Sequence, residues 1–252
     1  MSVALITGTT SGLGREYVNA VMQECPDVDE IWLLARRKDR MAAIQAAYPQ
    51  MTFRIVALDL SRQDSLIKFA EILEQNRPQI AAIIANAGVA YNGDVADMSA
   101  ERINMMLNLN VRGTTVFVRD CLKYMTAGSF ILLVSSASAF VPNPHLAVYS
   151  ATKAYIASFG LALREELKER QINVCTVMPG RMKTEMDKEL NQAGRQGVFN
   201  LIPSLNVAKF AHQTVKAAQS GSASYTMLAF YKVYRIIAKL VPHRFLIRFT
   251  KI

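Results

Sequence analysis

The sequence predicts a single-domain α/β fold, in which helices cover both faces of a doubly wound parallel sheet of six to seven strands. Its length of 252 residues suits one such domain. Short apolar segments alternate with helical patterns along the chain. These segments are continuously apolar, as in parallel strands that are buried on both faces.

The positions of the elements can be read in order from these patterns. We predict strands at Val3–Thr7, Glu30–Ala35, Thr52–Ala57, Ile80–Asn86, Ser129–Ser135 and Asn173–Met178. We predict helices between them at Gly12–Glu24, Arg37–Tyr48, Asp64–Asn76, Ala100–Met125 and Val148–Arg170. Residues 1–224 would form the main body of the domain, and residues 225–252 a basic amphipathic extension of it.

Positive charge is concentrated at the end of the chain. The formal net charge is +9, and Glu189 is the last acidic residue. The nine cations after it account for this excess: Arg195, Lys209, Lys216, Lys232, Arg235, Lys239, Arg244, Arg248 and Lys251. This pattern favours an anionic substrate, an anionic membrane surface or an acidic partner. We do not expect nucleic acid, because the tail has no recognised nucleic-acid motif.

Cysteine use and the N-terminus indicate a cytoplasmic protein. Cys25, Cys121 and Cys175 are widely spaced in apolar segments, which predicts reduced core residues and neither a disulfide framework nor a metal site. The first predicted strand begins at Val3 and leaves no room for a signal peptide. Attachment to the inner face of a membrane through the basic tail stays open.

Ligands of doubly wound folds bind at the carboxyl ends of the strands, so the residues just after each strand are candidates for a site. Gly8, Gly12 and Gly14 come after the first strand, where glycine lets the backbone turn and present N–H groups to an anion. Arg36 and Arg37 come after the second strand. A guanidinium there suits the 2′-phosphate of NADP, whereas an acidic residue would bind a ribose hydroxyl.

The other strand ends also carry small or polar residues: Asp59 and Leu60; Asn86, Ala87 and Gly88; Ser135, Ser136 and Ser138; Pro179, Gly180, Met182 and Thr184. In the helix after the fifth strand, Tyr149 and Lys153 are spaced i, i+4 and share one face. An ammonium group near a phenol stabilises the phenolate, so this pair makes sense as a proton donor and acceptor.

Taken in order, Thr7-Gly8-x-x-x-Gly12-x-Gly14, Asn86-Ala87-Gly88, Asn110, Ser136, Tyr149-x-x-x-Lys153 and Pro179-Gly180 strongly resemble the short-chain dehydrogenase/reductase family, as far as Thr184. The resemblance implies a Rossmann fold that binds NADP. It implies Tyr149 as general acid/base, Ser136 as the group that polarises the carbonyl, Lys153 as ribose ligand and stabiliser of the Tyr149 anion, and Asn110 as holder of a relay water.

The resemblance also implies a set of cofactor-binding residues besides Tyr149 and Lys153: Gly8, Thr9, Thr10, Ser11, Gly12, Leu13, Gly14, Arg36, Arg37, Asp59, Leu60, Asn86, Ala87, Gly88, Pro179, Gly180, Met182 and Thr184. It implies no metal. A homodimer or homotetramer would form through the helices predicted at Ala100–Met125 and Val148–Arg170.

The tail is less well explained by the resemblance. Lys232, Arg235 and Lys239 recur at helical spacing in an amphipathic helix that ends near Pro242. Three interpretations stay open: a helix packed on its own domain, shallow attachment to an anionic membrane, or a cover for a hydrophobic pocket.

A predicted lid precedes the tail. It would run from Met186 through Leu190, Phe199, Leu201 and Ile202, with Gly194 and Gly197 as hinges. Arg195 or an arginine of the tail would face a substrate carboxylate. Together with Phe140, Val141 and His145 it favours a hydrophobic, anionic small molecule such as a steroid, a bile acid or a long acyl chain.

We therefore expect an NADP(H)-dependent oxidoreductase that interconverts a ketone and a secondary alcohol. The alternatives are a non-catalytic nucleotide-sensing or membrane-docked scaffold of the same fold, and a methyltransferase, which would not need Tyr149 and Lys153.

Overall fold

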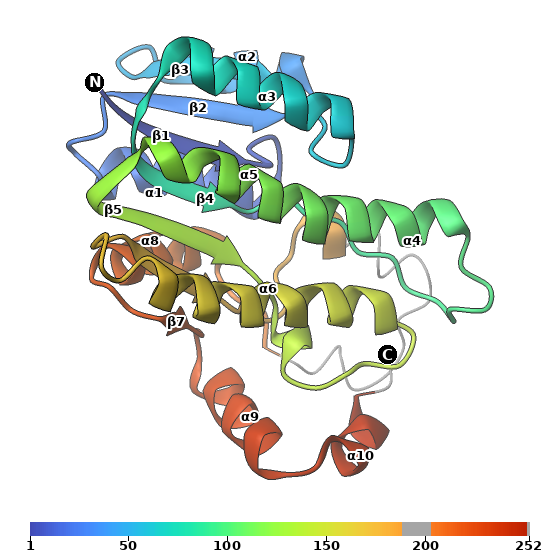
Figure 1. Ribbon diagram of the computed structural model, residues 1–252. Helices are drawn as coiled ribbons and strands as arrows, with labels where there is room; N and C mark the ends of the chain where they lie inside the picture. Colours follow the sequence, from blue (N-terminus) through green and yellow to red (C-terminus); the bar gives the residue numbers. More distant parts are fainter. Residues whose placement is uncertain (188–202, 251–252) are drawn as a thin grey trace.

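The computed structural model describes residues 1–187 and 203–250, and it confirms the doubly wound α/β fold (Figure 1). A seven-stranded sheet has the order β3-β2-β1-β4-β5-β6-β7, and every neighbouring pair is parallel. The strands are β1 (Ser2–Thr7), β2 (Glu30–Ala35), β3 (Thr52–Ala57), β4 (Gln79–Ala85), β5 (Met125–Val134), β6 (Asn173–Val177) and β7 (Ser224–Tyr225). The strand order reverses between β1 and β4, where ligands bind in such folds.

Helices cover both faces of the sheet. The described helices of these two layers are α1 (Gly12–Glu24), α2 (Lys38–Ala47), α3 (Gln63–Asn76), α4 (Ala100–Met106), α5 (Thr114–Cys121), α6 (Ala147–Glu166) and α8 (Val207–Gln219). One core joins α1, α2 and α8 to the sheet, and the other joins α3, α5 and α6. Neighbouring residues of a strand face opposite sides: Ile6 lies in the first core and Leu5 in the second.

The helix predicted over Ala100–Met125 is divided and ends earlier. The chain runs from α4 through a π-helical segment, Leu107–Gly113, into α5, and Figure 1 shows this as one long helical rod. Strand β5 then begins at Met125, before the predicted Ser129, because Met125 pairs with Ile80 across an irregular register.

Two further helices lie beyond the sheet at the C-terminal end: α9 (Ala229–Leu240) and α10 (His243–Leu246) (Figure 1). Ala238 of α9 is buried in a small core with Phe140, Val141 and Met178. The boundary predicted after residue 224 falls inside β7. Within the described ranges, no helix combines the length and apolar character needed to cross a membrane.

Candidate active site

A cavity of about 490 Å³ opens at the carboxyl ends of the central strands. Between β1 and α1, Gly8 has a positive φ of 73° and its N–H donates to the Leu34 carbonyl at 2.8 Å. A Cβ on Gly14 would overlap the Gly8 carbonyl oxygen, so only glycine lets α1 start this close to β1. Ser11, which precedes α1, makes no side-chain cap, and the first N–H groups of the helix are therefore left for a ligand.

The structure brings most of the predicted site residues together around this cavity. Those lining it are Gly8, Thr10, Ser11, Gly12, Leu13, Gly14, Arg36, Arg37, Asp59, Leu60, Asn86, Ala87, Gly88, Ser136, Tyr149, Lys153, Pro179, Gly180, Met182 and Thr184. Thr9 and Asn110 are not part of the lining. Thr9 is completely buried, and its hydroxyl has no hydrogen-bond partner among the described residues.

Asn86 links the glycine loop to β4. Its side-chain amide donates to the Thr7 carbonyl at 3.1 Å, while the Thr7 hydroxyl accepts from the backbone N–H groups of Asn86 and Ala87, each at 3.0 Å. These bonds fix the ends of the two strands between which the sheet order reverses. The floor of the cavity is therefore held by hydrogen bonds within the protein itself.

Asn110 lies outside the cavity lining and contacts residues that form the floor of the cavity. It lies in the π-helical segment, a distortion that often marks functional sites. Its Oδ1 accepts from Val89 N at 2.9 Å, and its Nδ2 donates to Val89 O at 2.9 Å and to Thr152 Oγ1 at 3.1 Å. A Cβ on Gly88 would lie 3.1 Å from Asn110 Oδ1 and 3.3 Å from Lys153 Nζ. Asn110 and Lys153 thus both lie close to Gly88.

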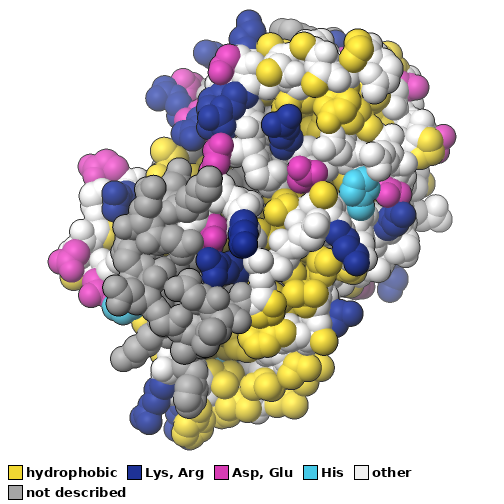
Figure 2. All heavy atoms as spheres, turned by 180° about the vertical axis from the view of Figure 1, so that it is seen from behind, with side chains coloured by type: hydrophobic (Ala, Val, Ile, Leu, Met, Phe, Trp, Pro, Cys, Tyr) yellow, Lys and Arg dark blue, Asp and Glu magenta, His cyan; other side chains and the backbone are white. Residues whose placement is uncertain are grey.

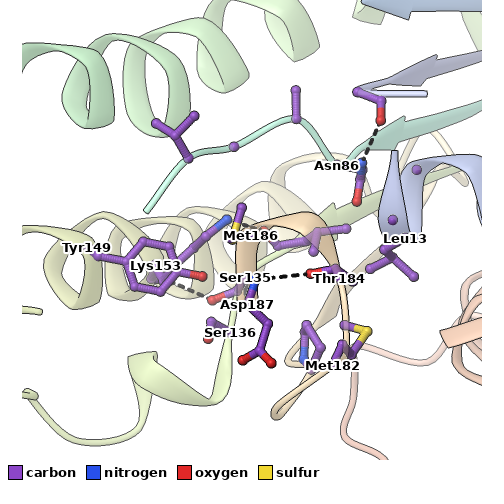
Figure 3. Close-up of a pocket in the computed structure, with 18 of the residues that line it drawn as sticks. Leu13, Asn86, Ser135, Ser136, Tyr149, Lys153, Met182, Thr184, Met186 and Asp187 are labelled. Carbon is purple, nitrogen blue, oxygen red and sulfur yellow. Dashed lines mark hydrogen bonds between the residues drawn. The ribbon is translucent and has the colours of Figure 1, made fainter. Parts of the chain in front are cut away.

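Lys153 and Tyr149 both point from α6 into the cavity (Figure 3). Lys153 Nζ lies 5.8 Å from the centre of the Tyr149 ring and donates to the Val134 carbonyl at 2.9 Å. Burial lowers the pKa of the Lys153 ammonium to about 8, because the charged form loses its hydration. The amine and the phenol ring are therefore neighbours in a desolvated site.

The two serines at the end of β5 have different contacts. The Ser135 hydroxyl donates to the Lys153 carbonyl at 2.6 Å and anchors α6 to the strand. The Ser136 hydroxyl accepts from Ser138 N at 3.1 Å and donates to Ser138 Oγ, also at 3.1 Å. Both serines line the cavity, but Ser135 has its proton engaged with backbone, whereas Ser136 can turn toward a ligand.

Three arginines lie at or near the end of the cavity that is formed by the glycine loop. Arg37 donates to Thr10 Oγ1 at 3.0 and 3.2 Å and lies 3.6 Å from the Glu185 carboxylate. Arg40 pairs with the same carboxylate at 3.0 Å, and these contacts, that with Arg40 foremost, lower the pKa of Glu185. Arg36 lines the cavity and is exposed, with no hydrogen bond or ion pair to any described residue.

The other end of the cavity is largely apolar, and its C-terminal wall agrees with one of the three interpretations left open for the tail helix, that of a cover for a hydrophobic pocket. Phe230, Tyr231 and Tyr234 of α9 line it together with Leu246 and Met186. The aromatic residues of the tail helix are visible in the sequence. Which of them face the cavity is not.

Several residues predicted for the substrate region lie elsewhere. Phe140 and Val141 pack against α9 in the core, and His145 pairs with Asp94 at 2.7 Å outside the cavity lining. Met186 is part of the cavity wall. The remainder of the predicted lid, with Leu190, Gly194, Arg195, Gly197, Phe199, Leu201 and Ile202, lies outside the described residues.

The residues present fit a dinucleotide. The backbone of the glycine loop, which lacks side chains, and the uncapped N–H groups of α1 suit a pyrophosphate. The guanidinium of Arg36 at the edge of the cavity suits a further phosphate. The buried amine and the phenol at the far end suit ribose hydroxyls and a reacting carbonyl.

Comparison with known proteins shows the family and the fold of the chain. Residues 2–195 match the short chain dehydrogenase family. An uncharacterized oxidoreductase of Staphylococcus epidermidis is 26% identical over 186 residues, covering 73% of this chain and 79% of the relative.

Two solved structures share the fold. The short-chain dehydrogenase of Sphingobium yanoikuyae in complex with NADPH has a TM-score of 0.78 at 23% identity, covering 95% of this chain and 94% of its own. The 3-ketoacyl-(acyl-carrier-protein) reductase of Brucella melitensis with NADH has 0.75 at 21%, covering 89% and 93%. The family match spans most of the sequence, and on that ground the chain belongs to the short chain dehydrogenases, a family of oxidoreductases.

Proposed function

We propose that this oxidoreductase uses NADP(H) to interconvert a ketone and a secondary alcohol on a hydrophobic small molecule. The observation that carries the proposal is the placement of Lys153 Nζ 5.8 Å from the Tyr149 ring, in the cavity that also holds the glycine loop and Ser136. The methyltransferase alternative is answered by the family match. The scaffold alternative is addressed by replacing Tyr149.

In the reduction, Tyr149 donates its phenolic proton to the carbonyl oxygen, and Ser136 donates a hydrogen bond to the same oxygen. The ammonium of Lys153 stabilises the phenolate left behind and binds ribose hydroxyls. Asn110 keeps Lys153 and the α6 backbone in register through Val89 and Thr152. The nicotinamide, when bound, supplies or accepts the hydride.

The preference for NADP rests on Arg36. This guanidinium faces the cavity with no described partner, so it is ready to pair with a 2′-phosphate. Arg37 would contribute less, because it already contacts Thr10 and Glu185. The similar structures carry either cofactor: the Sphingobium protein holds NADPH, and the Brucella reductase NADH.

The substrate is proposed to be apolar and bulky because Met186, Phe230, Tyr231 and Leu246 form its end of the cavity. The name of the Brucella reductase describes a ketone on an acyl chain, which agrees with this class. We further propose that chains associate as dimers or tetramers through α5 and α6, because Tyr155 and Leu161 of α6 are large apolar side chains that are exposed.

Replacing Tyr149 by Phe tests the function. The change removes the proton donor and keeps the ring, so turnover with a panel of bulky ketones should fall by roughly a thousandfold or more, while NADPH binding stays within about threefold. Absorbance of NADPH reports turnover, and protein fluorescence reports binding. Tyr155→Phe is the matched control: its hydroxyl is on the same helix but outside the cavity, so activity should be unchanged. Undiminished turnover in Tyr149→Phe, or no turnover of any ketone by the natural chain, would favour the scaffold.

A further inference from the structure

The C-terminal helix α9 presents apolar side chains to solvent as well as to the protein. Tyr231, Tyr234, Arg235 and Ala238 are spaced i, i+3, i+4, i+7 and form the inward face, each buried or half-buried. Val233, Ile236, Ile237 and Leu240 have the same spacing and form a second stripe, exposed by 54%, 57%, 40% and 78%. Large apolar residues normally occupy the buried stripe alone, so the second one calls for a partner.

This stripe belongs to a larger patch. Phe230, one turn before Val233, is 49% exposed, and Phe245 of α10 is 50% exposed. These six side chains are half of the large hydrophobic residues that are exposed among the described ones. Figure 2 shows hydrophobic side chains gathered at the lower end of the molecule, where Figure 1 places α9 and α10.

Cations flank the apolar residues of the patch in the sequence, and neither α9 nor α10 contains an acidic residue. Lys232 and Lys239 lie seven positions apart on α9 and are exposed, as are Arg244 and Arg248. The Arg244 guanidinium lies 4.8 Å from the Phe245 ring. The sequence has no Asp or Glu after Glu189. A helix with an apolar face beside a basic edge is the pattern of segments that lie in the surface of an anionic bilayer.

We infer that α9 and α10 form a docking surface for an anionic membrane, with the stripe Val233/Ile236/Ile237/Leu240 inserted among the lipids and the cations on their headgroups. The other candidate occupant is a second copy of this chain. Self-association through this surface would bring two basic edges together without any acidic residue of α9 or α10 to neutralise them, which disfavours it. At twelve residues α9 is too short to cross a bilayer and fits an interfacial position.

The docking surface and the cavity share α9. Phe230, Tyr231 and Tyr234 line the cavity from the same helix whose outward stripe would touch lipid. A docked molecule therefore holds the apolar end of its cavity next to the bilayer. The docking itself does not depend on the proposed function, because it is measured without substrate or cofactor.

Co-sedimentation of the full chain with vesicles tests the inference. The chain should sediment with phosphatidylcholine vesicles that contain phosphatidylglycerol and much less with phosphatidylcholine alone. Val233→Ser with Ile236→Ser should lower the apparent partition coefficient more than tenfold, because the inserted surface becomes polar. Lys232→Gln with Lys239→Gln should lower it by about tenfold or more on anionic vesicles only.

Ile67→Ser with Val95→Ser is the matched control, since these side chains are 53% and 50% exposed on other parts of the molecule, and its binding should equal that of the natural chain. Thermal unfolding confirms that each variant is folded. The inference is overturned if the natural chain stays in the supernatant with anionic vesicles, or if the Val233/Ile236 variant binds like its control. Loss of a dimer in that variant, seen by sedimentation velocity without any vesicle binding by the natural chain, would show that a second copy covers the stripe.

Discussion

At the scale of single residues, Lys153 is a charged group whose burial lowers the stability of the fold but places an amine in the active site. A lysine normally keeps its charge in water, but this one is 5% exposed and donates to one carbonyl, that of Val134. Burial lowers its pKa to about 8. The charge thus lies where it would stabilise a phenolate at Tyr149, and burying it lowers the free energy of unfolding near neutral pH.

We predict that Lys153→Met removes this cost and its pH dependence. Between about pH 8 and about pH 10.5 the unfolded natural chain binds the Lys153 proton and the folded chain does not, so its stability rises with pH in that window. From about pH 7 to about pH 9.5, the free energy of unfolding of the natural chain should rise by about 2 kcal/mol relative to that of Lys153→Met. Urea unfolding at both pH values measures this gap, and Lys68→Met, at an exposed lysine of α3, should show no such change. A gap that does not vary with pH would contradict the assignment.

Arg36 and Arg40 make a second residue-level comparison, because both are exposed but only Arg36 lines the cavity. A charge-assisted bond to a 2′-phosphate is worth about 1.5–3 kcal/mol, so Arg36→Ser should weaken NADPH binding roughly tenfold to a hundredfold and NADH binding less than about threefold. Arg40→Ser, which removes an ion pair with Glu185, should leave both affinities nearly unchanged. Calorimetric titration with each cofactor measures these affinities. Equal losses of affinity for NADPH and NADH in Arg36→Ser would remove the basis for the NADP preference.

At the scale of elements, α9 is held against the cavity loop by an aromatic contact. A Cβ on Gly180 would overlap the ring of Tyr231, so the ring rests directly on the glycine. The Tyr231 hydroxyl accepts from Arg181 N at 2.9 Å and donates to the Pro203 carbonyl at 3.1 Å. Gly180 is therefore needed for this close approach of helix and loop.

Gly180→Ala should destabilise the protein by about 1–3 kcal/mol, because the added methyl group displaces Tyr231 and α9 with it. Tyr231→Ala should relieve that clash, so the double variant should lose less stability than the sum of the two single losses. Tyr231→Phe keeps the ring and should give no relief. Denaturant unfolding of the natural chain, Gly180→Ala, Tyr231→Ala and their double variant provides the cycle. Strict additivity would show that the ring does not limit residue 180.

The elements also show what a sequence can and cannot reveal here. The glycine loop, Asn86–Gly88 and Tyr149/Lys153 were predictable because each depends on spacing within a few residues, and the structure brings them to one cavity. Tyr231 was not, since its contact with Arg181 joins positions 50 apart. The two-residue strand β7 was missed because a pairing that short has no periodicity. Helix α8 was missed although its buried residues recur at helical spacing and Asn206 caps its N-terminus.

At the scale of the whole molecule, two exposed apolar surfaces have different chemistry. That of α9 is bordered by cations. The other lies along α6, where Tyr155 and Leu161 are 40% and 48% exposed and Tyr155 stacks on Phe159 with ring centres 6.0 Å apart. The Tyr155 hydroxyl lies 3.1 Å from Thr115 Oγ1 of α5, so the two helices present one continuous surface. Such an exposed apolar surface suits a two-fold contact between chains, in which each residue meets its own symmetry mate or a neighbour of it.

Tyr155→Glu with Leu161→Glu should therefore convert the natural oligomer into smaller units. Four carboxylates would have to be buried near one another in a two-fold contact, which costs far more than the lost apolar area alone. Sedimentation velocity should show the mass of the natural chain fall to that of the monomer in this variant, while Ile67→Glu, on an exposed position of α3, leaves the mass unchanged. Vesicle binding should persist in the monomer, although weaker, because each chain carries its own α9 stripe and loses only the gain from two linked sites. A natural chain that is already monomeric, or a variant that keeps the oligomer, would show that α5 and α6 do not form the contact. Complete loss of vesicle binding in a folded monomer would show instead that docking requires two stripes held side by side.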